Sequence, residues 1–448
     1  MGSIGATGLA LSGGMYSLSS VSGNLPGYRA LVIIHLNGGS DGHELILPLD
    51  TGYNDYAKIR PNIALKRDEI TPISGRFFDR SLGINSALSP LLPSITQGRM
   101  AFLLNVGPLI KPTNAYDVLN GRATLPPFLF SHPEQTQVSQ GWTGDEDQSG
   151  WLGRGIETLD ASSQLKAPFL AIDSKQSTVI RGRNSRIINV DVFGSSFMGP
   201  ANLTQPTSNW TQLFDSMTRY QSPTQVEAEY ARTYRNVFLD NQELARADSL
   251  TQQPLGSFED NDIARRLRRI AKLMPFYKAN GATRQAFYIN WGEFDTHAFQ
   301  RNAGSGTHKR QPLDPQLSQL AKALAAFEIS LQGAGLGNEV AVLVMSEFGR
   351  TLDEAAGYGT DHAWGNHWMV LGAGVRDGLV FGRQFPKLVL GSDEDASEQK
   401  RGYLVPDFSV DQVAADFLLW MGLPADKLTD VLPNLANFST PRMGFLNA

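Results

Sequence analysis

The chain has 448 residues, of which 41% are hydrophobic and 19% charged, a size and balance that can bury a large core. Its formal net charge of −5 and pI near 5.9 give no basic field to attract nucleic acid, and the lack of cysteine excludes disulfides and thiolate ligands. Any metal ion would therefore be held by nitrogen and oxygen atoms.

The N-terminal segment, residues 1–28, is predicted to be the remnant of an export signal or a flexible tail. Residues 4–20 are small, rich in glycine and serine and weakly apolar, like the middle of a bacterial signal peptide, but the first basic residue is Arg29. A twin-arginine signal that has lost its basic start would direct the protein to the periplasm or outside the cell. The sequence contains no run of about twenty apolar residues that would span a bilayer.

Six short apolar runs are predicted to form the strands of a central sheet. The first, residues 29–36, is typical of a strand buried on both faces and leads into the glycine-rich stretch 37–42. The others are residues 100–106, 168–172, 285–290, 340–345 and 368–371. Helical periodicity separates several of these runs, for example over residues 314–333. This alternation predicts an α/β fold with a mostly parallel central sheet flanked by helices.

Residues 29–448 are predicted to form a single α/β domain with a helical insertion at about 208–280. The insertion has long charged helical patterns and no convincing strand pattern. Residues 110–127 and 194–207 are rich in proline, glycine and asparagine and are predicted to be long loops. Loops of that length are candidates for function.

The stretch 359–367 (GTDHAWGNH) offers metal-ligand atoms from Asp361, His362 and His367. Carboxylate oxygen and imidazole nitrogen are common ligands of Zn²⁺, Mn²⁺ and Mg²⁺. Gly359 and Gly365 would let the loop bend so that these side chains serve one ion. In the alternative interpretation, Asp361 caps a turn and the histidines form hydrogen bonds in the core.

A second motif, FDTH, contains Asp295 and His297, which project to the same side of an extended segment because they are two residues apart. Two further carboxylates, Asp41 and Glu347, lie at the ends of predicted strands. Together the two motifs and these carboxylates form a set large enough for two divalent ions, which could be Zn, Mn, Mg or Ca. Glu347 could instead form a salt bridge with Arg350 or cap a helix.

Ser131 is the most suggestive nucleophile, because it lies beside His132 after the apolar residues 127–130. A hydroxyl group near a metal centre can attack an ester directly. The alternative interpretation is an ordinary loop serine.

Several ordered motifs match a known family, from about residue 31 to the C-terminus. They are LNGGSDGHELILP (36–48), SH (131–132), SGWLGR (149–154), FDTH (294–297), SEFGRT (346–351), GTDHAWGNH (359–367) and VFGR (380–383). By these motifs the chain resembles the bacterial domain-of-unknown-function 1501 family. That family is a branch of the alkaline-phosphatase-like superfamily, which also contains sulfatases and cofactor-independent phosphoglycerate mutases.

The resemblance implies an alkaline-phosphatase-like fold and a site for two metal ions. One ion is expected to be held by Asp41, Asp361 and His362, with Ser131 bridging as the nucleophile. The other is expected to be held by Asp295, His297 and His367. The residues after Ser131 lack the arginine of the sulfatase formylglycine motif, so an aldehyde nucleophile is not expected.

These observations predict an exported, metal-dependent hydrolase of phosphate or sulfate monoesters, with a serine or a metal-bound hydroxide as nucleophile. The substrate would be a small anionic ester or a sulfated or phosphorylated glycan, and His132 or Arg350 would steady the leaving group or an ester oxygen. The alternative is a secreted or surface-exposed binding or assembly protein, either a homo-oligomer or bound to another partner, that keeps the scaffold with a relic site.

Overall fold

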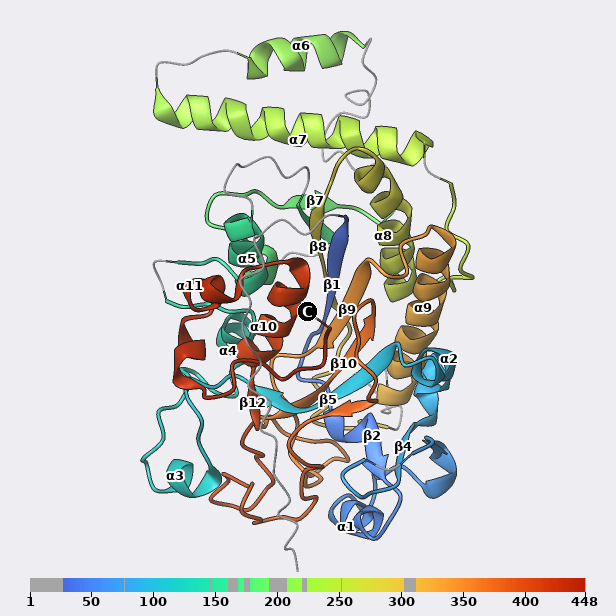
Figure 1. The fold of residues 1–448 in the computed structure, drawn as a ribbon, viewed down its shortest axis with the longest axis vertical. Coiled ribbons are helices and arrows are strands. Elements are labelled where there is room, and N and C mark those ends of the chain that lie inside the picture. The colour runs from blue at the N-terminus through green and yellow to red at the C-terminus, as the bar shows by residue number, and fades with distance from the viewer. Residues whose placement is uncertain are drawn as a thin grey trace, which may run out of the picture.

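The computed structural model describes residues 27–75, 77–144, 147–159, 168–172, 178–192, 208–219, 224–250, 252–301 and 312–447. Most of the segment predicted to be an export signal or tail, and the predicted loop 194–207, lie outside this part of the chain. The described residues form a central sheet with helices on both of its faces (Figure 1).

The central sheet confirms the six predicted strands, with ends within two residues of the expected ones. Its strands are β1 (Arg29–Leu36), β5 (Met100–Gly107), β6 (Phe169–Ile172), β7 (Ile188–Val190), β8 (Arg284–Trp291), β9 (Val340–Met345), β10 (Asn366–Gly372), β11 (Val380–Phe381) and β12 (Phe408–Ser409). Their order is β11-β5-β10-β9-β1-β8-β6-β7, and β12 pairs with β5. Among the described strands of this sheet, only β10 runs antiparallel to its neighbours, so the sheet is mostly parallel, as predicted.

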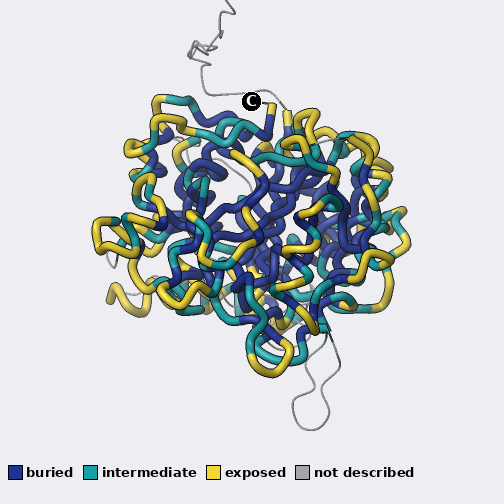
Figure 2. Tube along the Cα trace, turned by 90° about the horizontal axis from the view of Figure 1, so that it is seen from below, coloured by how far each residue is buried: buried dark blue, intermediate teal, exposed yellow. Residues whose placement is uncertain are grey.

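The strands are continuous apolar runs because both faces of the sheet are covered. Alternate residues of β1 pack into two different cores. Val32 and Ile34 contribute to the core beneath α8 and α9, whereas Leu31 and Ile33 contribute to the core beneath α5 and α10. Figure 2 shows the buried segments gathered at the centre of the molecule and the exposed ones at its periphery.

The helices cover the two faces of the sheet and its ends. They are α1 (Gly52–Ile59), α2 (Leu92–Thr96), α3 (Ala115–Leu119), α4 (His132–Ser139), α5 (Trp151–Leu159), α6 (Asn209–Thr218), α7 (Gln225–Leu250), α8 (Asp262–Ala279), α9 (Leu313–Gly333), α10 (Val410–Met421) and α11 (Leu428–Val431). Short 3₁₀ helices are η1 (Gly42–Glu44), η2 (Arg67–Glu69), η3 (Ser86–Leu91), η4 (Thr178–Ile180), η5 (Ala425–Lys427) and η6 (Pro433–Asn437). In the described part of the chain, none of the helices is both long and apolar enough to cross a membrane.

The region 208–280 contains α6, α7 and α8 and no strand in its described residues. It does not form one separate unit, because α8 buries its apolar face against α9 and the sheet, whereas α6 and α7 lie at the outer edge (Figure 1). The predicted loop 110–127 contains the short helix α3. A second sheet, with the order β2-β4-β3, was not predicted and is formed by β2 (Ile46–Pro48), β4 (Leu82–Asn85) and β3 (Ile70–Pro72).

Candidate metal centre

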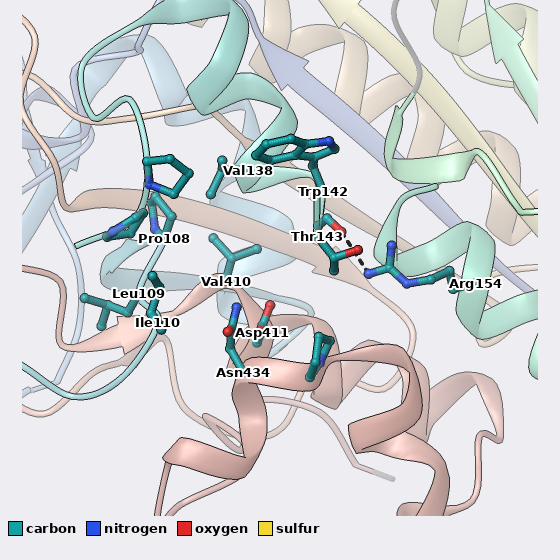
Figure 3. A pocket seen from close by; sticks show the side chains of 14 residues that line it. Pro108, Leu109, Ile110, Val138, Trp142, Thr143, Arg154, Val410, Asp411 and Asn434 are labelled. Carbon is teal, nitrogen blue, oxygen red and sulfur yellow. Dashed lines mark hydrogen bonds between the residues drawn. The ribbon is translucent and has the colours of Figure 1, made fainter. Parts of the chain in front are cut away.

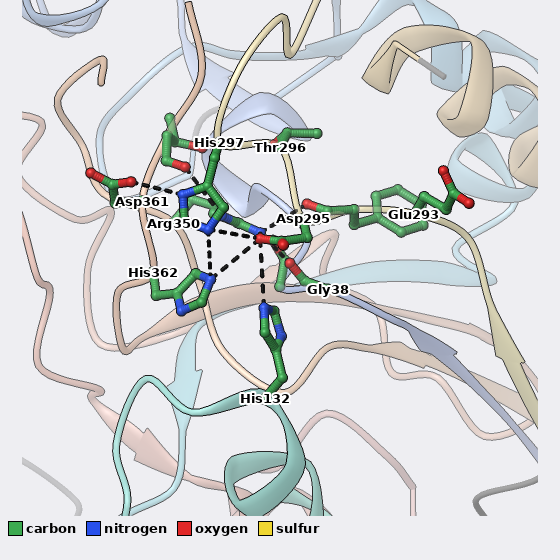
Figure 4. Close-up of polar contacts among 12 residues, drawn as sticks. Gly38, His132, Glu293, Asp295, Thr296, His297, Arg350, Asp361 and His362 are labelled. Atoms are coloured by element: carbon green, nitrogen blue, oxygen red, sulfur yellow. Dashed lines mark hydrogen bonds and ion pairs between the residues drawn. The ribbon is translucent and has the colours of Figure 1, made fainter. Parts of the chain in front are cut away.

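A cluster of histidine and carboxylate side chains lies at one edge of the central sheet (Figure 4). Asp295 and His297 follow β8, and His362 precedes β10. The carboxyl end of β8 and the amino end of β10 meet at the same edge, because β10 runs opposite to the parallel strands. His132, the first residue of α4, completes the cluster.

Four side-chain atoms converge in this cluster. The Oδ1 atom of Asp295 lies 3.5 Å from Nε2 of His132, 3.0 Å from Nε2 of His297 and 3.3 Å from Nε2 of His362. The Nε2 atoms of His297 and His362 are 2.9 Å apart. A tetrahedral Zn²⁺ site with ligand bonds of about 2.0–2.1 Å has ligand atoms roughly 3.3 Å apart. Three residues, His132, Asp295 and His362, each offer a ligand atom within 4.8 Å of the other two, and His297 lies beside them against Asp295 and His362.

The other ring nitrogen of each histidine has an oxygen partner. The pairs are His132 Nδ1 with Glu347 Oε1 (2.8 Å), His297 Nδ1 with Asp361 Oδ1 (2.8 Å) and His362 Nδ1 with the carbonyl oxygen of Phe130 (2.7 Å). A carboxylate or carbonyl oxygen only accepts, so in the neutral ring each pair assigns the proton to Nδ1 and leaves a lone pair on Nε2. All three lone pairs then face the cluster.

A divalent cation fits this arrangement. With both protons on Nδ1, the Nε2 lone pairs of His297 and His362 would face each other without an intervening donor. The Nε2 atom of His132 is buried and has no hydrogen-bond partner. A cation bound by His132, Asp295 and His362 would give the buried His132 nitrogen a partner and would separate the facing nitrogens of His362 and His297, as expected of a site with nitrogen and oxygen ligands.

The two most buried carboxylates of the centre remain ionised. Burial would raise the pKa of Glu347, but the hydrogen bond from His132 and the nearby histidine charges outweigh it and lower that pKa to about 2. Burial is likewise outweighed at Asp295, where the adjacent side chains of His132, His362 and Arg350 hold the pKa well below its usual value. The same two carboxylates, Asp295 and Glu347, raise the pKa of His132 to about 9 in the metal-free protein, so this ring must release a proton before its Nε2 can bind an ion.

Glu347 supports His132 from behind and is not among the converging ligand atoms. Its buried carboxylate accepts hydrogen bonds from His132 and from the backbone N–H of Gly38 (2.9 Å). It makes neither the predicted ligand contact nor the alternative salt bridge to Arg350, because its oxygens face His132 and the loop after β1.

Arg350 is buried and has a partner on each of its nitrogens. Nε donates to the carbonyl of Gly39 (2.6 Å), Nη1 to the carbonyl of Thr360 (3.1 Å), and Nη2 to Asp295 Oδ1 (2.7 Å) and to the carbonyl of Phe294 (3.1 Å). The predicted role of Arg350, steadying the leaving group, would need a free nitrogen. The observed contacts fit a residue that positions Asp295.

Asp41 lies away from the converging atoms. It is fully buried and accepts hydrogen bonds from Arg60 (2.7 Å) and Gln300 (2.7 Å). Arg60 also pairs with Glu44 at 2.6 Å. The charge of Asp41 is therefore already compensated, and no direct contact joins it to the cluster among the described residues.

His367 also lies apart from the cluster, inside strand β10. Its Nδ1 accepts a hydrogen bond from the backbone N–H of Asn105 (3.1 Å), and its ring packs edge-on against His43 with centroids 5.1 Å apart. Burial lowers the pKa of His367 to about 4, which keeps the ring neutral. This environment matches the alternative interpretation of a core histidine.

Ser131 is the residue just before α4 and donates its hydroxyl hydrogen bond to Glu134, three residues along the chain. It is not bonded to a cluster residue in the described structure. The neighbouring His132, by contrast, points into the cluster (Figure 4). Of the predicted SH pair, the histidine is the residue that reaches the centre.

Two backbone features help to shape the centre, and the sequence indicated only the glycine. Phe130 has a φ of 71°, a left-handed conformation that costs a residue with a side chain about 1–3 kcal/mol, and its carbonyl accepts the bond from His362. Gly359 approaches His297 so closely that a Cβ atom would lie 2.2 Å from the His297 carbonyl carbon. Gly359 is thus needed because a side chain at this position would collide with the backbone of the FDTH motif, and not because the backbone adopts a left-handed turn there.

A pocket separate from the cluster lies between α4, α5 and α10 (Figure 3). It is lined by Pro108, Leu109, Ile110, Pro126, Pro127, Val138, Gly141, Trp142, Thr143, Arg154, Val410, Asp411, Pro433 and Asn434. Burial raises the pKa of Asp411 to about 6, although Arg154 and Asn434 act against it. None of the lining residues belongs to the cluster.

The family model described as "Protein of unknown function (DUF1501)" matches residues 93–430. The chain belongs to this family. No curated protein matches the chain.

Two solved structures are similar over most of the chain. One is the C-terminal periplasmic domain of EcEptC from Escherichia coli in complex with Zn, with 8% identity, a TM-score of 0.36 and coverage of 91% of this chain and 85% of that chain. The other is the phosphonate monoester hydrolase SpPMH from Silicibacter pomeroyi, with 11% identity, a TM-score of 0.33 and coverage of 89% and 73%. Similarity at this level does not extend to function.

Proposed function

We propose that this protein is a metal-dependent hydrolase of phosphate or sulfate monoesters that works with a divalent ion at the cluster of His132, Asp295, His297 and His362. One observation carries the proposal. Three histidine Nε2 atoms and one carboxylate oxygen converge, while each histidine Nδ1 is held by an oxygen acceptor. This pattern is typical of histidines that bind a metal through Nε2.

The bound ion would polarise an ester oxygen and make a nearby water molecule more acidic, which are the two effects that ester hydrolysis needs. The chain's own residues orient this chemistry. Glu347 and Asp361 hold the rings of His132 and His297, and Arg350 holds Asp295. The rigid edge of the sheet keeps these groups in place before substrate arrives.

The residues support one ion and not the expected two. A second ion would need Asp41, but Arg60 already compensates that carboxylate with a contact of 2.7 Å. Similarly, the Ser131 hydroxyl bonds to Glu134, which favours water over Ser131 as the nucleophile. We therefore propose a centre with a single divalent ion.

The test is elemental analysis of protein purified without chelator and then dialysed against Zn²⁺ or Mn²⁺, followed by assays on aryl phosphates and aryl sulfates. We expect one ion per chain, and loss of both the ion and the activity in His362→Ala. Glu134→Gln is the matched control, because it changes a carboxylate of α4 outside the cluster. A wild-type protein that binds no ion under these conditions would end the proposal.

Export also remains part of the proposal, on the composition of residues 4–20. The full-length chain should then appear in the periplasmic fraction or the medium of the native host. Finding it only in the cytoplasm would contradict this part and leave the metal centre unaffected.

A second candidate function, in binding or assembly, is favoured by one observation on α6 and α7. Large apolar side chains that are each more than half exposed recur along both helices. They are Trp210, Leu213 and Met217 on α6 and Val226, Tyr230 and Tyr234 on α7. Exposed apolar surfaces of this kind often bind a partner. Light scattering of the purified protein, compared with Tyr230→Ser, tests for self-association, and a single-chain mass at every concentration would count against it.

A further inference from the structure

Two guanidinium groups border the cluster, and they differ in what they can still bind. Each side-chain nitrogen of Arg350 has a hydrogen-bond partner, and the side chain has no exposed surface. Arg401 donates from Nη1 to Asp361 Oδ2 (2.5 Å) and from Nε to Asp353 Oδ2 (3.0 Å). Its Nη2 has no hydrogen-bond partner among the described residues, and 22% of its side chain is exposed.

Arg401 lies on the open side of the centre. Its partner Asp361 accepts the Nδ1 hydrogen bond of His297 through the other carboxylate oxygen. The side chains of His297 and Asp361 are 43% and 34% exposed, whereas those of Glu347 and Arg350 have no exposed surface. The cluster is therefore exposed at His297, Asp361 and Arg401, and also at His132 and Asp295, whose side chains are 33% and 32% exposed.

The charges on this side favour an anion. Burial would lower the pKa of Arg401, but hydrogen bonds with Asp353 and Asp361 outweigh it and raise the pKa, so the guanidinium stays charged. A divalent ion and the two guanidinium groups would carry four positive charges, which balance the four carboxylates Asp295, Glu347, Asp353 and Asp361, so the attraction for an anion is local to the ion and to the unpaired nitrogen of Arg401. A guanidinium also presents its N–H groups in a planar fork that matches a phosphate or sulfate oxygen pair.

The two aspartates also fix where the guanidinium points. Asp353 and Asp361 hold Nε and Nη1 of Arg401, so the side chain is fixed in one rotamer and the direction of the remaining nitrogen, Nη2, is set before a ligand binds. Tyr403, two residues along the chain, packs against Phe130 with ring centroids 5.1 Å apart, and the carbonyl of Phe130 holds His362. Arg401 and the Phe130–Tyr403 pair thus both lie beside a group that holds a histidine of the cluster.

We infer that Arg401 is the residue that binds the anionic oxygens of the ester, through Nη2, while the ester group faces the ion. This inference rests on the proposed function and names the side chain that selects an anionic substrate. A neutral ester would gain nothing from Arg401. Arg350, the arginine that the sequence favoured for this role, is fully occupied in holding Asp295.

Inorganic phosphate is the probe for the test, because its binding requires no turnover. Titration calorimetry on the metal-saturated protein should show that Arg401→Gln weakens phosphate binding by roughly ten- to a hundredfold. Arg401→Lys should recover part of the affinity, since it keeps the charge but not the fork. Arg383→Gln is the matched control, because Arg383 is an exposed arginine that packs over Phe408 outside the cluster.

Metal content of the same samples separates the two roles that Arg401 can have. If Arg401 only positions Asp361, Arg401→Gln weakens metal binding but leaves phosphate affinity at saturating metal equal to that of the wild type. That result would overturn the inference. If no ion binds to the wild type, the proposed function fails. If phosphate binds in an Arg401-dependent way but no ester is hydrolysed, the hydrolase proposal fails and the inference stands.

Discussion

Replacing Glu347 tests the hydrogen-bond support of the metal centre without touching a ligand atom. The Glu347 carboxylate has no exposed surface and accepts hydrogen bonds from His132 Nδ1 (2.8 Å) and from the backbone N–H of Gly38 (2.9 Å). In Glu347→Gln the amide oxygen can keep both bonds, but the negative charge behind His132 is lost. In Glu347→Ala both bonds are lost and the Gly38 N–H is left buried without a partner.

The expected magnitudes follow from these contacts. A hydrogen bond to a charged group contributes about 1.5–3 kcal/mol, and a tenfold change in affinity corresponds to about 1.4 kcal/mol. Glu347→Gln keeps a neutral bond, so we expect metal affinity to fall about tenfold. Glu347→Ala should lower it about a hundredfold, in the range seen for residues that support metal-bound histidines. The alanine variant should also lose about 1–3 kcal/mol of unfolding free energy, because it orphans a buried donor.

The assay is competition for Zn²⁺ with a coloured chelator, together with urea unfolding of the metal-free proteins. Ser346 provides a control, since Ser346→Ala removes a neighbour of Glu347 that bonds to it at 3.1 Å without contacting His132. Zinc affinity of Glu347→Gln and Glu347→Ala equal to that of the wild type would refute the argument that Glu347 orients His132.

Three further outcomes follow from charges elsewhere in the chain. Arg60→Leu should destabilise the fold by about 3–5 kcal/mol in urea unfolding, because it leaves the buried carboxylates Asp41 and Glu44 without a counter-charge, and an unchanged midpoint would contradict this. Asp411 has a folded-state pKa raised to about 6, so the stability that its protonation contributes is present at acid pH and is lost as pH rises through 6. Asp411→Asn should therefore raise the unfolding free energy by up to about 3 kcal/mol at pH 8 and leave it unchanged below pH 4. A gain in stability that is the same at every pH would show that the ionisation of Asp411 is not its cause. His132 has a pKa near 9 in the metal-free protein and must release a proton to bind metal. Zn²⁺ affinity, measured by competition with a chelator, should therefore rise from pH 6 to pH 9. An affinity that does not change with pH would argue against His132 as a ligand.

The sequence predicted the central sheet well because its strands are buried on both faces. Continuous apolar runs such as 29–36 and 340–345 are typical of strands that are covered on both faces. Both runs form strands with the predicted ends. The strands β2, β3 and β4 were missed because they are only three or four residues long and lie among polar turns. Short elements of this kind depend on their neighbours more than on their own pattern.

The candidate centre was predicted in part for a similar reason. Asp295, His297 and His362 belong to motifs at strand ends, and strand ends of one sheet edge are expected to meet. Glu347 was expected as a ligand but lies behind His132. Asp41 also follows a strand, yet its side chain pairs with Arg60. Strand position indicates which edge a side chain reaches, but not which partner it finds there.

The sequence by itself determined where strands form and which side chains stand at their ends, because apolar runs and their polar boundaries are local properties of the chain. The tertiary structure alone decided which of those side chains meet. Glu347 contacts His132 from 215 residues away, and Asp41 contacts Gln300 from 259 residues away. The choice of such partners depends on distances set by the packing of the whole sheet and its helices, and hydrogen bonds form only within about 3.5 Å. No local pattern encodes that separation.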